Sequence, residues 1–186
     1  GDLERHGNPL ELAPRKVLRN AVGAWEKHGF VPKVGIEFEA YLMQPDNNGN
    51  WVPYDSPGSF VYGTGPMNDP MGVAMAIDEK ADQLGFRIES FNTEFDVGQF
   101  EMTLEYDDAM ACADEAFLFR AMAMDMAAQR GFRLTFLPRP ILEFGGNGLH
   151  VNFSLCDKKG NNLMLDSKKE DGLSDLAKSC ISGQLF

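Results

Sequence analysis

The sequence predicts an α+β fold in which helices cover one face of a largely antiparallel β-sheet. Segments with helical spacing of apolar residues alternate with pairs of strand-like segments, which is typical of this fold class. In addition, a Gly-Phe pair ends three helical patterns and begins the next strand pattern, at Gly29, Gly85 and Gly131. Glycine can adopt the left-handed conformation just after a helix, while the Phe packs back on the last turn.

Apolar spacing and capping residues predict the individual elements. Pro14 suits the first turn of a helix, Asp69 is expected as the N-cap of a second helix, and Asp107 or Asp108 as the N-cap of a third. The predicted helices are residues 13–28, 69–84, 107–130 and a last helix from about residue 172. The predicted strands are residues 34–43, two strands within 89–106, 133–137 and 149–157, and residues 51–68 are predicted to be a long loop.

Length and composition indicate a single domain, residues 1–186, that acts neither on nucleic acid nor in a membrane. The chain has 186 residues, of which 44% are hydrophobic and 24% charged, as in ordinary globular domains. Its formal net charge of −11 is opposite to the basic surface that nucleic acids require. No apolar run approaches the ~20 residues of a membrane span. The cysteines Cys112, Cys156 and Cys180 lack metal-site spacing and are expected to be reduced thiols in the cytoplasm.

Residues 89–106 carry an unusual concentration of acid. They contain five acidic residues and no Lys or Arg, although the alternation of apolar residues predicts strands packed in a sheet. Because clustered acids in a packed strand need compensation, we expect a cation near Glu94, Gln99 and Glu101. A solvated acidic face of an edge strand is the alternative explanation.

A second pair of acids lies on the strand at residues 34–43. Glu37 and Glu39 share one face of this strand, about 6.6 Å apart at the backbone, which suits two neighbouring ions better than one. A solvated strand face would produce the same pattern.

A third candidate is the glycine-rich segment at residues 145–148 with the strand that follows it. Its glycines allow the backbone to approach a ligand closely, and His150 follows in the polar row of the strand. A histidine with a purely structural role is the alternative.

Together these residues favour hard divalent cations. Carboxylates with one imidazole and an amide suit Mg²⁺ or Mn²⁺ better than Zn²⁺ or copper. Two such ions near a glycine-rich loop indicate phosphoryl chemistry, and a metal-dependent phosphohydrolase is one possibility on this chemistry alone.

The order of four motifs resembles the catalytic domain of glutamine synthetase. They are Gly-Ile-Glu-Phe-Glu at 35–39, Glu94 with Gly-Gln-Phe-Glu at 98–101, Thr-Phe-Leu-Pro-Arg-Pro at 135–140, and Gly-Asn-Gly-Leu-His at 146–150. The resemblance spans roughly residues 14–183. It implies a curved, largely antiparallel sheet with helices on one face. It also implies that the chain is the N-terminal part of this catalytic domain, without the family's small N-terminal domain and its C-terminal half.

The resemblance implies roles for particular residues. Glu39, Glu94 and Glu101 would bind the metal that organises glutamate and ammonia, and Glu37 and His150 would bind a second metal on the ATP phosphates. The positions that match nucleotide contacts are Glu89, Tyr106, Asn152 and Ser154, and those that match substrate contacts are Gly146 and Asn147. No catalytic side chain is assigned beyond the metal ligands.

The implied reaction is the ATP-dependent formation of glutamine from glutamate and ammonia through γ-glutamyl phosphate. Such a ligase of nitrogen metabolism would use ATP and two or more Mg²⁺ or Mn²⁺ ions, in a cytoplasmic ring of identical subunits. Gly145 replaces the family's usual Asn, and Asn152 replaces a common second His, so a polyamine or another amine could replace ammonia. A non-catalytic relative is a further alternative. Because half of the site would be missing, the chain alone is expected to be inactive or nearly so.

Overall fold

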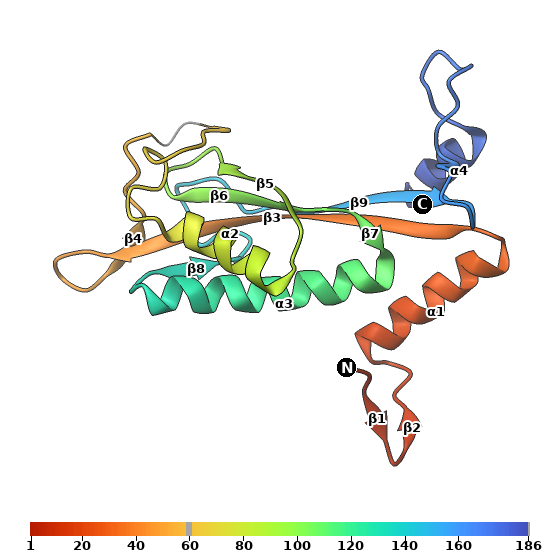
Figure 1. Cartoon of the computed structure of the whole chain (residues 1–186), viewed down its shortest axis with the longest axis horizontal. Coiled ribbons are helices and arrows are strands. Elements are labelled where there is room, and N and C mark those ends of the chain that lie inside the picture. Colours follow the sequence, from red (N-terminus) through yellow and green to blue (C-terminus); the bar gives the residue numbers. More distant parts are fainter. Residues whose placement is uncertain (59–60, 186) are drawn as a thin grey trace. The chain divides into compact units, whose positions relative to one another are not determined.

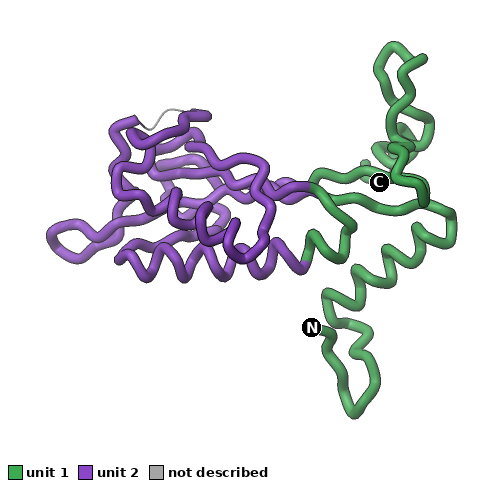
Figure 2. Tube along the Cα trace, in the orientation of Figure 1, with its two compact units in different colours: residues 1–34, 106–113, 152–186 green, residues 35–105, 114–151 purple. Residues whose placement is uncertain are grey.

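A computed structural model, which describes residues 1–58 and 61–185, confirms the α+β class (Figure 1). Its contacts divide the chain into two compact units (Figure 2). The terminal unit consists of residues 1–34, 106–113 and 152–186, and the sheet unit consists of residues 35–105 and 114–151. The single domain expected from the length stays a prediction. Residues 59 and 60, which fall in the predicted loop, lie outside the described residues.

The sheet is organised around one long central strand, β3 (Val31–Pro45). The strand order is β4-β3-β6-β5, where β4 is Trp51–Pro53, β6 is Gln99–Leu104 and β5 is Ile88–Thr93. Two further strands, β8 (Arg133–Thr135) and β9 (Leu149–Cys156), also pair with β3. The pairings of β3 with β4, β6 and β8, and of β5 with β6, are all antiparallel, as predicted.

Helices α2 (Val73–Leu84) and α3 (Ala109–Gln129) cover one face of the sheet (Figure 1). Phe38 of β3 lies against Phe119 of α3, with ring centroids 6.1 Å apart. The buried core of the sheet unit includes Phe38, Ala40, Leu42, Phe100, Met102, Leu104, Val73, Ile77, Ala81, Phe119, Ala123 and Ala127. Burial of these apolar side chains is the main force that holds the helices on the sheet.

The register of β3 with β6 decides which side chains face away from the helices. Phe38 lies opposite Met102, and Glu39 lies opposite Glu101. Cross-strand partners lie on the same face of a sheet, and successive residues alternate between faces. Since Phe38 and Met102 belong to the core under the helices, Glu39 and Glu101 lie together on the other face.

The three Gly-Phe helix ends are confirmed. Gly29, Gly85 and Gly131 have φ angles of 83°, 78° and 81°. The N–H of the Phe that follows each glycine donates to the carbonyl five residues back, at 3.1, 2.9 and 3.0 Å respectively. This is the hydrogen bond of a Schellman motif.

Two helix starts differ from the prediction. Helix α2 has Gly72 as its N-cap rather than Asp69, because Gly72 turns the chain with a φ of 63°. The Asp69 carboxylate still accepts the N–H groups of Val73 and Met75 from outside the helix. Helix α4 (Asp175–Gln184) begins after Ser174, whose hydroxyl accepts the N–H of Ala177, rather than near residue 172.

The start of α3 also differs in detail. Asp107 and Asp108 form a short strand, β7, which pairs with Val34 and Lys33 of β3. The Lys33 ammonium lies 2.7 Å from the Asp108 carboxylate. These aspartates therefore precede the helix and also pair with β3, at its residues Lys33 and Val34.

The remaining elements of the terminal unit are β1 (Glu4–Arg5), β2 (Asn8–Pro9) and α1 (Pro14–Lys27). The predicted helix is confirmed, but no residue of α1 is buried, and Leu18, Val22 and Trp25 of its apolar stripe are only partly covered. The Trp25 ring lies 6.0 Å from Phe30 and 6.1 Å from Phe153.

The cysteines carry no disulfide. Cys112 and Cys156 are buried thiols and Cys180 is a partly exposed thiol. Within the described residues, no helix combines the length and the apolar character needed to cross a membrane.

Candidate metal centre

Four glutamates of the sheet unit converge on the face opposite the helices. Glu37 and Glu39 lie on β3, Glu101 lies on β6, and Glu94 lies in the turn between β5 and β6. The Glu94 N–H donates to the carbonyl of Gln99 at 2.8 Å, which closes this turn. Strand pairing and one turn thus bring together acids that are up to 64 residues apart in the sequence.

Two groups of possible ligands share Glu101. The first is Glu39, Glu94 and Glu101, and the second is Glu37, Glu101 and His150. In each group, one ligand atom from every residue lies within 4.8 Å of the others. Ligands of a single ion lie within such distances of one another, so each group could hold a divalent cation.

His150 lies between the two strand glutamates. Its Nδ1 is 2.9 Å from Oε2 of Glu37, and its Nε2 is 3.8 Å from Oε1 of Glu39. The Glu39 side chain is only 12% exposed, whereas that of His150 is 55% exposed. The exposed imidazole of His150 therefore lies next to the largely buried carboxylate of Glu39.

The glutamates repel one another, and this is visible at Glu101. Burial raises the pKa of this carboxyl above 4.5, and the neighbouring Glu94, Glu37 and Glu39 raise it further, while His150 lowers it. A site that disfavours its own negative charge gains stability from a bound cation.

The glycine-rich loop lies directly against this cluster. The Gly148 N–H donates to Oε2 of Glu39 at 2.9 Å, and a Cβ on Gly148 would lie 2.6 Å from Oε1 of Glu39. A Cβ on Gly146 would lie 2.7 Å from the carbonyl oxygen of Pro138. At Gly146 the Pro138 backbone lies too close for a side chain, whereas a side chain at Gly148 would require the Glu39 and His150 side chains to move.

Gln99, which the sequence placed beside the expected cation together with Glu94 and Glu101, contacts other groups of the protein. Its side chain is buried, and its amide nitrogen lies within 3.2 Å of Oε2 of Glu39, the carbonyl of Gly146 and Oδ1 of Asn147. It therefore links a candidate ligand to the glycine-rich loop. The signal in the sequence was a polar residue at the start of a strand whose other face is apolar.

The predicted substrate residue Asn147 is already engaged by the protein. Its amide nitrogen donates to the carbonyl of Leu137 at 2.8 Å and lies 3.3 Å from that of Thr135, and its Oδ1 accepts from Gln99. The backbone N–H of Asn147 is engaged as well, since it donates to the carbonyl of Pro138 at 2.7 Å.

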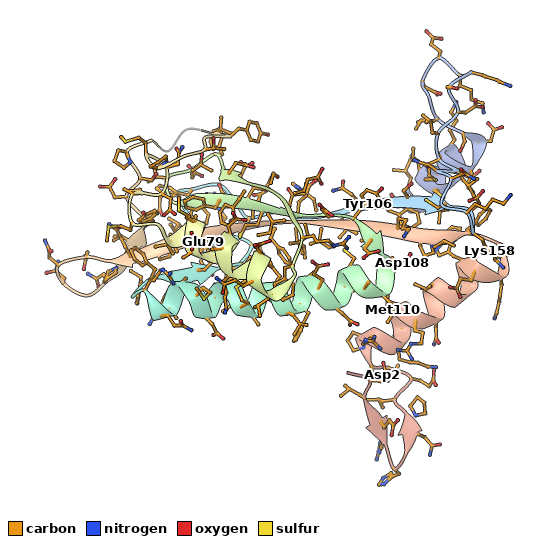
Figure 3. All side chains as sticks on the ribbon, in the orientation of Figure 1. Asp2, Glu79, Tyr106, Asp108, Met110 and Lys158 are labelled. Atoms are coloured by element: carbon orange, nitrogen blue, oxygen red, sulfur yellow. The ribbon has the colours of Figure 1, made fainter. Side chains whose placement is uncertain are left out.

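The predicted nucleotide residues are largely at the surface. Glu89 is exposed on β5 of the sheet unit. In the terminal unit, Tyr106 is 69% exposed just before β7 (Figure 3), Asn152 is exposed on β9, and the Ser154 hydroxyl lies 3.3 Å from Oδ1 of Asn162.

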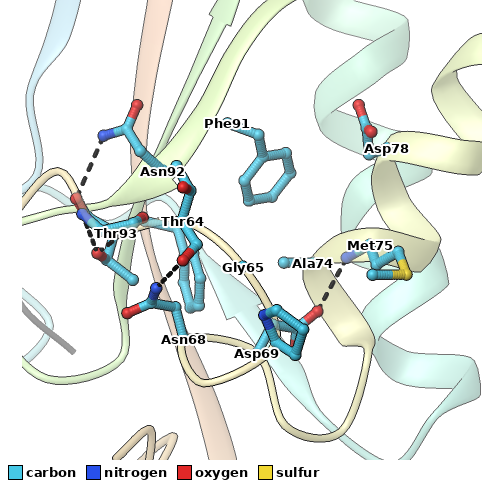
Figure 4. A pocket seen from close by; sticks show the side chains of 13 residues that line it. Thr64, Gly65, Asn68, Asp69, Ala74, Met75, Asp78, Phe91, Asn92 and Thr93 are labelled. Carbon is cyan, nitrogen blue, oxygen red and sulfur yellow. Dashed lines mark hydrogen bonds between the residues drawn. The ribbon is translucent and has the colours of Figure 1, made fainter. Parts of the chain in front are cut away.

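A separate pocket of about 170 Å³ lies between the start of α2, strand β5 and the loop at residues 63–69 (Figure 4). Its wall includes Met75, Phe91 and Phe100, with Asp78 at one side. The described residues that line it include none of the five candidate ligands. This pocket is distinct from the candidate metal centre.

The donors of the acidic cluster fit Mg²⁺ or Mn²⁺. Carboxylate oxygens dominate, a single imidazole is added, and no thiolate belongs to either group. Hard divalent cations prefer such oxygen-rich sites. The geometry therefore defines a class of α+β protein with helices on one face of an antiparallel sheet and two acidic groups, each able to hold a divalent cation, on the other face.

Comparison with known proteins identifies the family. The family model "Glutamine synthetase, catalytic domain" matches residues 11–186, so the chain belongs to the glutamine synthetase family. A glutamine synthetase of Halobacterium salinarum is 33% identical over 98% of the chain and 40% of its own length. A glutamate–isopropylamine ligase of Pseudomonas is 27% identical over 97% of the chain and 40% of its own length.

Solved structures agree with the fold. A structure described as a GmaS/ADP complex has a TM-score of 0.83 and 31% identity, over 95% of this chain and 41% of that chain. A glutamine synthetase of Plasmodium falciparum has a TM-score of 0.78 at 19% identity, over 95% of this chain and 40% of that chain, and shows the fold alone. The chain thus spans about 40% of the length of the relatives that it matches.

Proposed function

We propose that the chain is part of an ATP-dependent ligase that joins the γ-carboxylate of glutamate to ammonia through γ-glutamyl phosphate. The observation that carries this proposal is the convergence of two possible ligand groups on Glu101, in a chain of the glutamine synthetase family. Phosphorylation converts a carboxylate oxygen into a good leaving group, which the amine can then displace.

In this proposal the acidic cluster holds two divalent cations. Glu39, Glu94 and Glu101 would hold one, and Glu37 and His150 would hold the other, with Glu101 within reach of both. When bound, Mg²⁺ or Mn²⁺ would reduce the repulsion between the glutamate carboxylate and the ATP phosphates. The Gly148 N–H and the Gln99 amide orient Glu39 for this task by donating to its Oε2.

The chain's remaining contributions are to binding. On the family resemblance, the backbone at Gly146 would meet the substrate glutamate, and its loop lies beside the cluster, where the Gly146 carbonyl accepts from the Gln99 amide. Glu89, Tyr106, Asn152 and Ser154 are proposed to contact the nucleotide, on the family resemblance alone. The complete natural protein is proposed to form a homo-oligomer, which light scattering can test.

A second candidate for the amine is an alkylamine or a polyamine in place of ammonia. A relative that is named for isopropylamine covers the same part of the chain as the glutamine synthetases. A larger amine would need an apolar space next to the site that ammonia does not need. Phosphate release by the complete natural protein, with glutamate, ATP and either ammonia or a series of alkylamines and polyamines, separates the two candidates.

Metal binding can be tested on the 186-residue chain itself. Calorimetric titration with Mn²⁺ should detect binding by the wild type that is weakened about tenfold or more in Glu101→Gln, because this residue serves both groups. Glu79→Gln is the matched control, since Glu79 is an exposed glutamate on α2 (Figure 3). Equal Mn²⁺ affinity in all three proteins would exclude the proposed metal centre and favour a non-catalytic member of the family.

Catalysis requires the rest of the site. We expect the 186-residue chain to release no phosphate from ATP in the presence of glutamate and ammonia, because a partial site cannot stabilise the transition state. Robust glutamate-dependent phosphate release by this chain would show that the site is complete within it.

A further inference from the structure

Asp96 is an acidic residue of the turn between β5 and β6 that belongs to neither ligand group. Its Oδ2 accepts a hydrogen bond from the Tyr41 hydroxyl at 3.0 Å and another from the N–H of Gly145. Tyr41 is fully buried, and its hydroxyl also lies 2.9 Å from the carbonyl oxygen of Gly145. One carboxylate and one phenol thus bind both polar groups of the Gly145 backbone.

These contacts connect three segments that carry the candidate ligands. Asp96 is two residues after Glu94, in the same turn. Tyr41 is two residues after Glu39 on β3 and therefore lies on the same face of the sheet. Gly145 begins the glycine-rich loop that leads to His150. A shift of the Asp96 carboxylate would therefore move the loop relative to both ligand groups.

The absence of a side chain at Gly145 has a specific explanation. A Cβ at this position would lie 2.9 Å from Oδ2 of Asp96, and it would meet no other atom within 4 Å. The φ angle of Gly145 is outside the left-handed region, so its backbone conformation alone does not require glycine. The space that a side chain would need is occupied by the Asp96 carboxylate.

The loop is held at a second point by Gln99. This amide donates to the carbonyl of Gly146 and to Oδ1 of Asn147, while its own Oε1 lies 3.3 Å from the Asp96 N–H. The start of the loop depends on Asp96 and the next two residues depend on Gln99. Hydrogen bonds to a charged acceptor are stronger than neutral ones, so Asp96 provides the stronger of the two attachments.

We propose that Asp96 is a positioning residue, which holds the start of the glycine-rich loop against the metal-ligand cluster, and that Gly145 is matched to it. The role follows from the contacts in this chain. Its consequence for the substrate rests on the proposed function, in which the loop backbone meets glutamate. Asp96 itself touches neither substrate nor metal in this scheme.

The attachment can be measured without any activity, by amide hydrogen exchange at Gly145 in the 186-residue chain. Asp96→Ala should speed exchange at Gly145 about tenfold or more, because a charge-assisted hydrogen bond is lost. Asp96→Asn should restore most of the protection, since its amide oxygen can accept the same N–H. Asp125→Ala, at an exposed aspartate on α3, is the matched control and should leave exchange at Gly145 unchanged.

Folding is monitored in the same experiment through exchange at Ala123, which lies in the buried core of α3. If Asp96→Ala unfolds the chain, Tyr41→Phe provides the second test, because it removes the hydroxyl that contacts both the Asp96 carboxylate and the Gly145 carbonyl. It should also speed exchange at Gly145. Unchanged exchange at Gly145 in a folded Asp96→Ala or Tyr41→Phe chain would overturn the proposal.

The match between the two positions predicts non-additive effects. Gly145→Ala should disturb the loop as Asp96→Ala does, because its methyl group displaces the carboxylate. The double variant Asp96→Ala/Gly145→Ala should exchange no faster at residue 145 than the Asp96→Ala variant, since the clash has been removed. Fully additive acceleration would show that the two positions act independently.

The consequence for substrate is tested in the complete natural protein. Asp96→Ala should raise the KM for glutamate about tenfold and the KM for ATP by clearly less, because the loop backbone meets glutamate directly and the nucleotide only through His150. A general loss of structure would change both values together, and that outcome would reject the positioning role. If the wild type shows no ligase activity, the proposed function fails, and the exchange experiment still decides the role of Asp96.

Discussion

Gly148 and Glu39 bind each other at two points. The Gly148 N–H donates to the Glu39 carboxylate at 2.9 Å, and the Gly148 carbonyl accepts the backbone N–H of Glu39 at 3.1 Å. The end of the glycine-rich loop is therefore fixed to both the backbone and the side chain of a candidate metal ligand. This relationship makes the loop and the cluster one structural unit.

Gly148→Ala should weaken Mn²⁺ binding by about tenfold or more, the usual effect of disturbing a partner of a metal ligand. The new methyl group would lie 2.6 Å from Oε1 of Glu39 and 2.8 Å from Nε2 of His150, so both ligands must move. Calorimetric titration provides the affinity. Gly23→Ala on α1 is the control, since a Cβ there meets nothing within 4 Å. An unchanged affinity in Gly148→Ala would contradict the close contact described above.

Glu101→Gln should stabilise the metal-free chain by ~0.5 kcal/mol at neutral pH, because Glu101 lies directly opposite Glu39 and like charges at such positions are destabilising. The free energy of unfolding can be measured by urea titration. With added Mn²⁺ the wild type should have the larger free energy of unfolding, since the ion stabilises the wild type more than the variant. A less stable metal-free variant would contradict the repulsion between these carboxylates.

The stability gained in Glu101→Gln should depend on pH. The folded state raises the pKa of Glu101 above 4.5, so the folded chain binds more protons than the unfolded chain around and above that pH. The contribution of Glu101 to the free energy of unfolding is thus most favourable below its unfolded pKa, and it declines as the pH rises through the raised pKa. Urea titrations of both proteins between pH 4 and 8 should show a difference that increases with pH. If the difference in the free energy of unfolding decreased from pH 4 to 8, the result would contradict a raised pKa for Glu101 in the folded chain.

Gln99→Leu should lower the free energy of unfolding by about 2–3 kcal/mol. The variant keeps an apolar body of similar size but removes the donor that Glu39, Gly146 and Asn147 share, and buried acceptors without partners are costly. Thermal or urea unfolding measures the loss. Gln83→Leu on the exposed side of α2 should change stability by less than ~0.5 kcal/mol. Similar effects at the two positions would mean that the buried network contributes nothing.

Gly131→Ala should destabilise the chain by ~1–2 kcal/mol through backbone strain alone. Gly131 has a φ of 81°, and a Cβ there meets nothing within 4 Å, so no clash contributes. Urea unfolding should show this loss together with unchanged Mn²⁺ binding, because the residue is in a helix end and not in the cluster. If Gly131→Ala left the free energy of unfolding unchanged, residue 131 would not be held in the left-handed conformation.

Much of this architecture follows from local patterns. The alternation of residues from Phe100 to Leu104 predicted the buried and polar faces of β6, and the Gly-Phe pairs predicted three helix ends. Both predictions succeed because the two-residue repeat of a strand and the left-handed conformation of a glycine depend only on a short segment of chain. Helix starts were less accurate. The chain uses Gly72 rather than Asp69 as the N-cap of α2 and begins α4 after Ser174, because a side chain outside a helix, such as that of Asp69, can still accept the first N–H groups.

The sequence by itself determined the longer strands, the helix ends and the set of acidic residues, since these depend on residue types at short spacing. It missed the short strands β1, β2, β4 and β7, of which β4 lies in the predicted loop at residues 51–68. Only the tertiary structure decided that Glu39 lies opposite Glu101, that Gln99 joins Glu39 to the loop, and that Asp96 holds Gly145. These relationships connect residues up to 62 positions apart, the separation of Glu39 and Glu101. They depend on strand register and on the path of a loop, which no local pattern specifies.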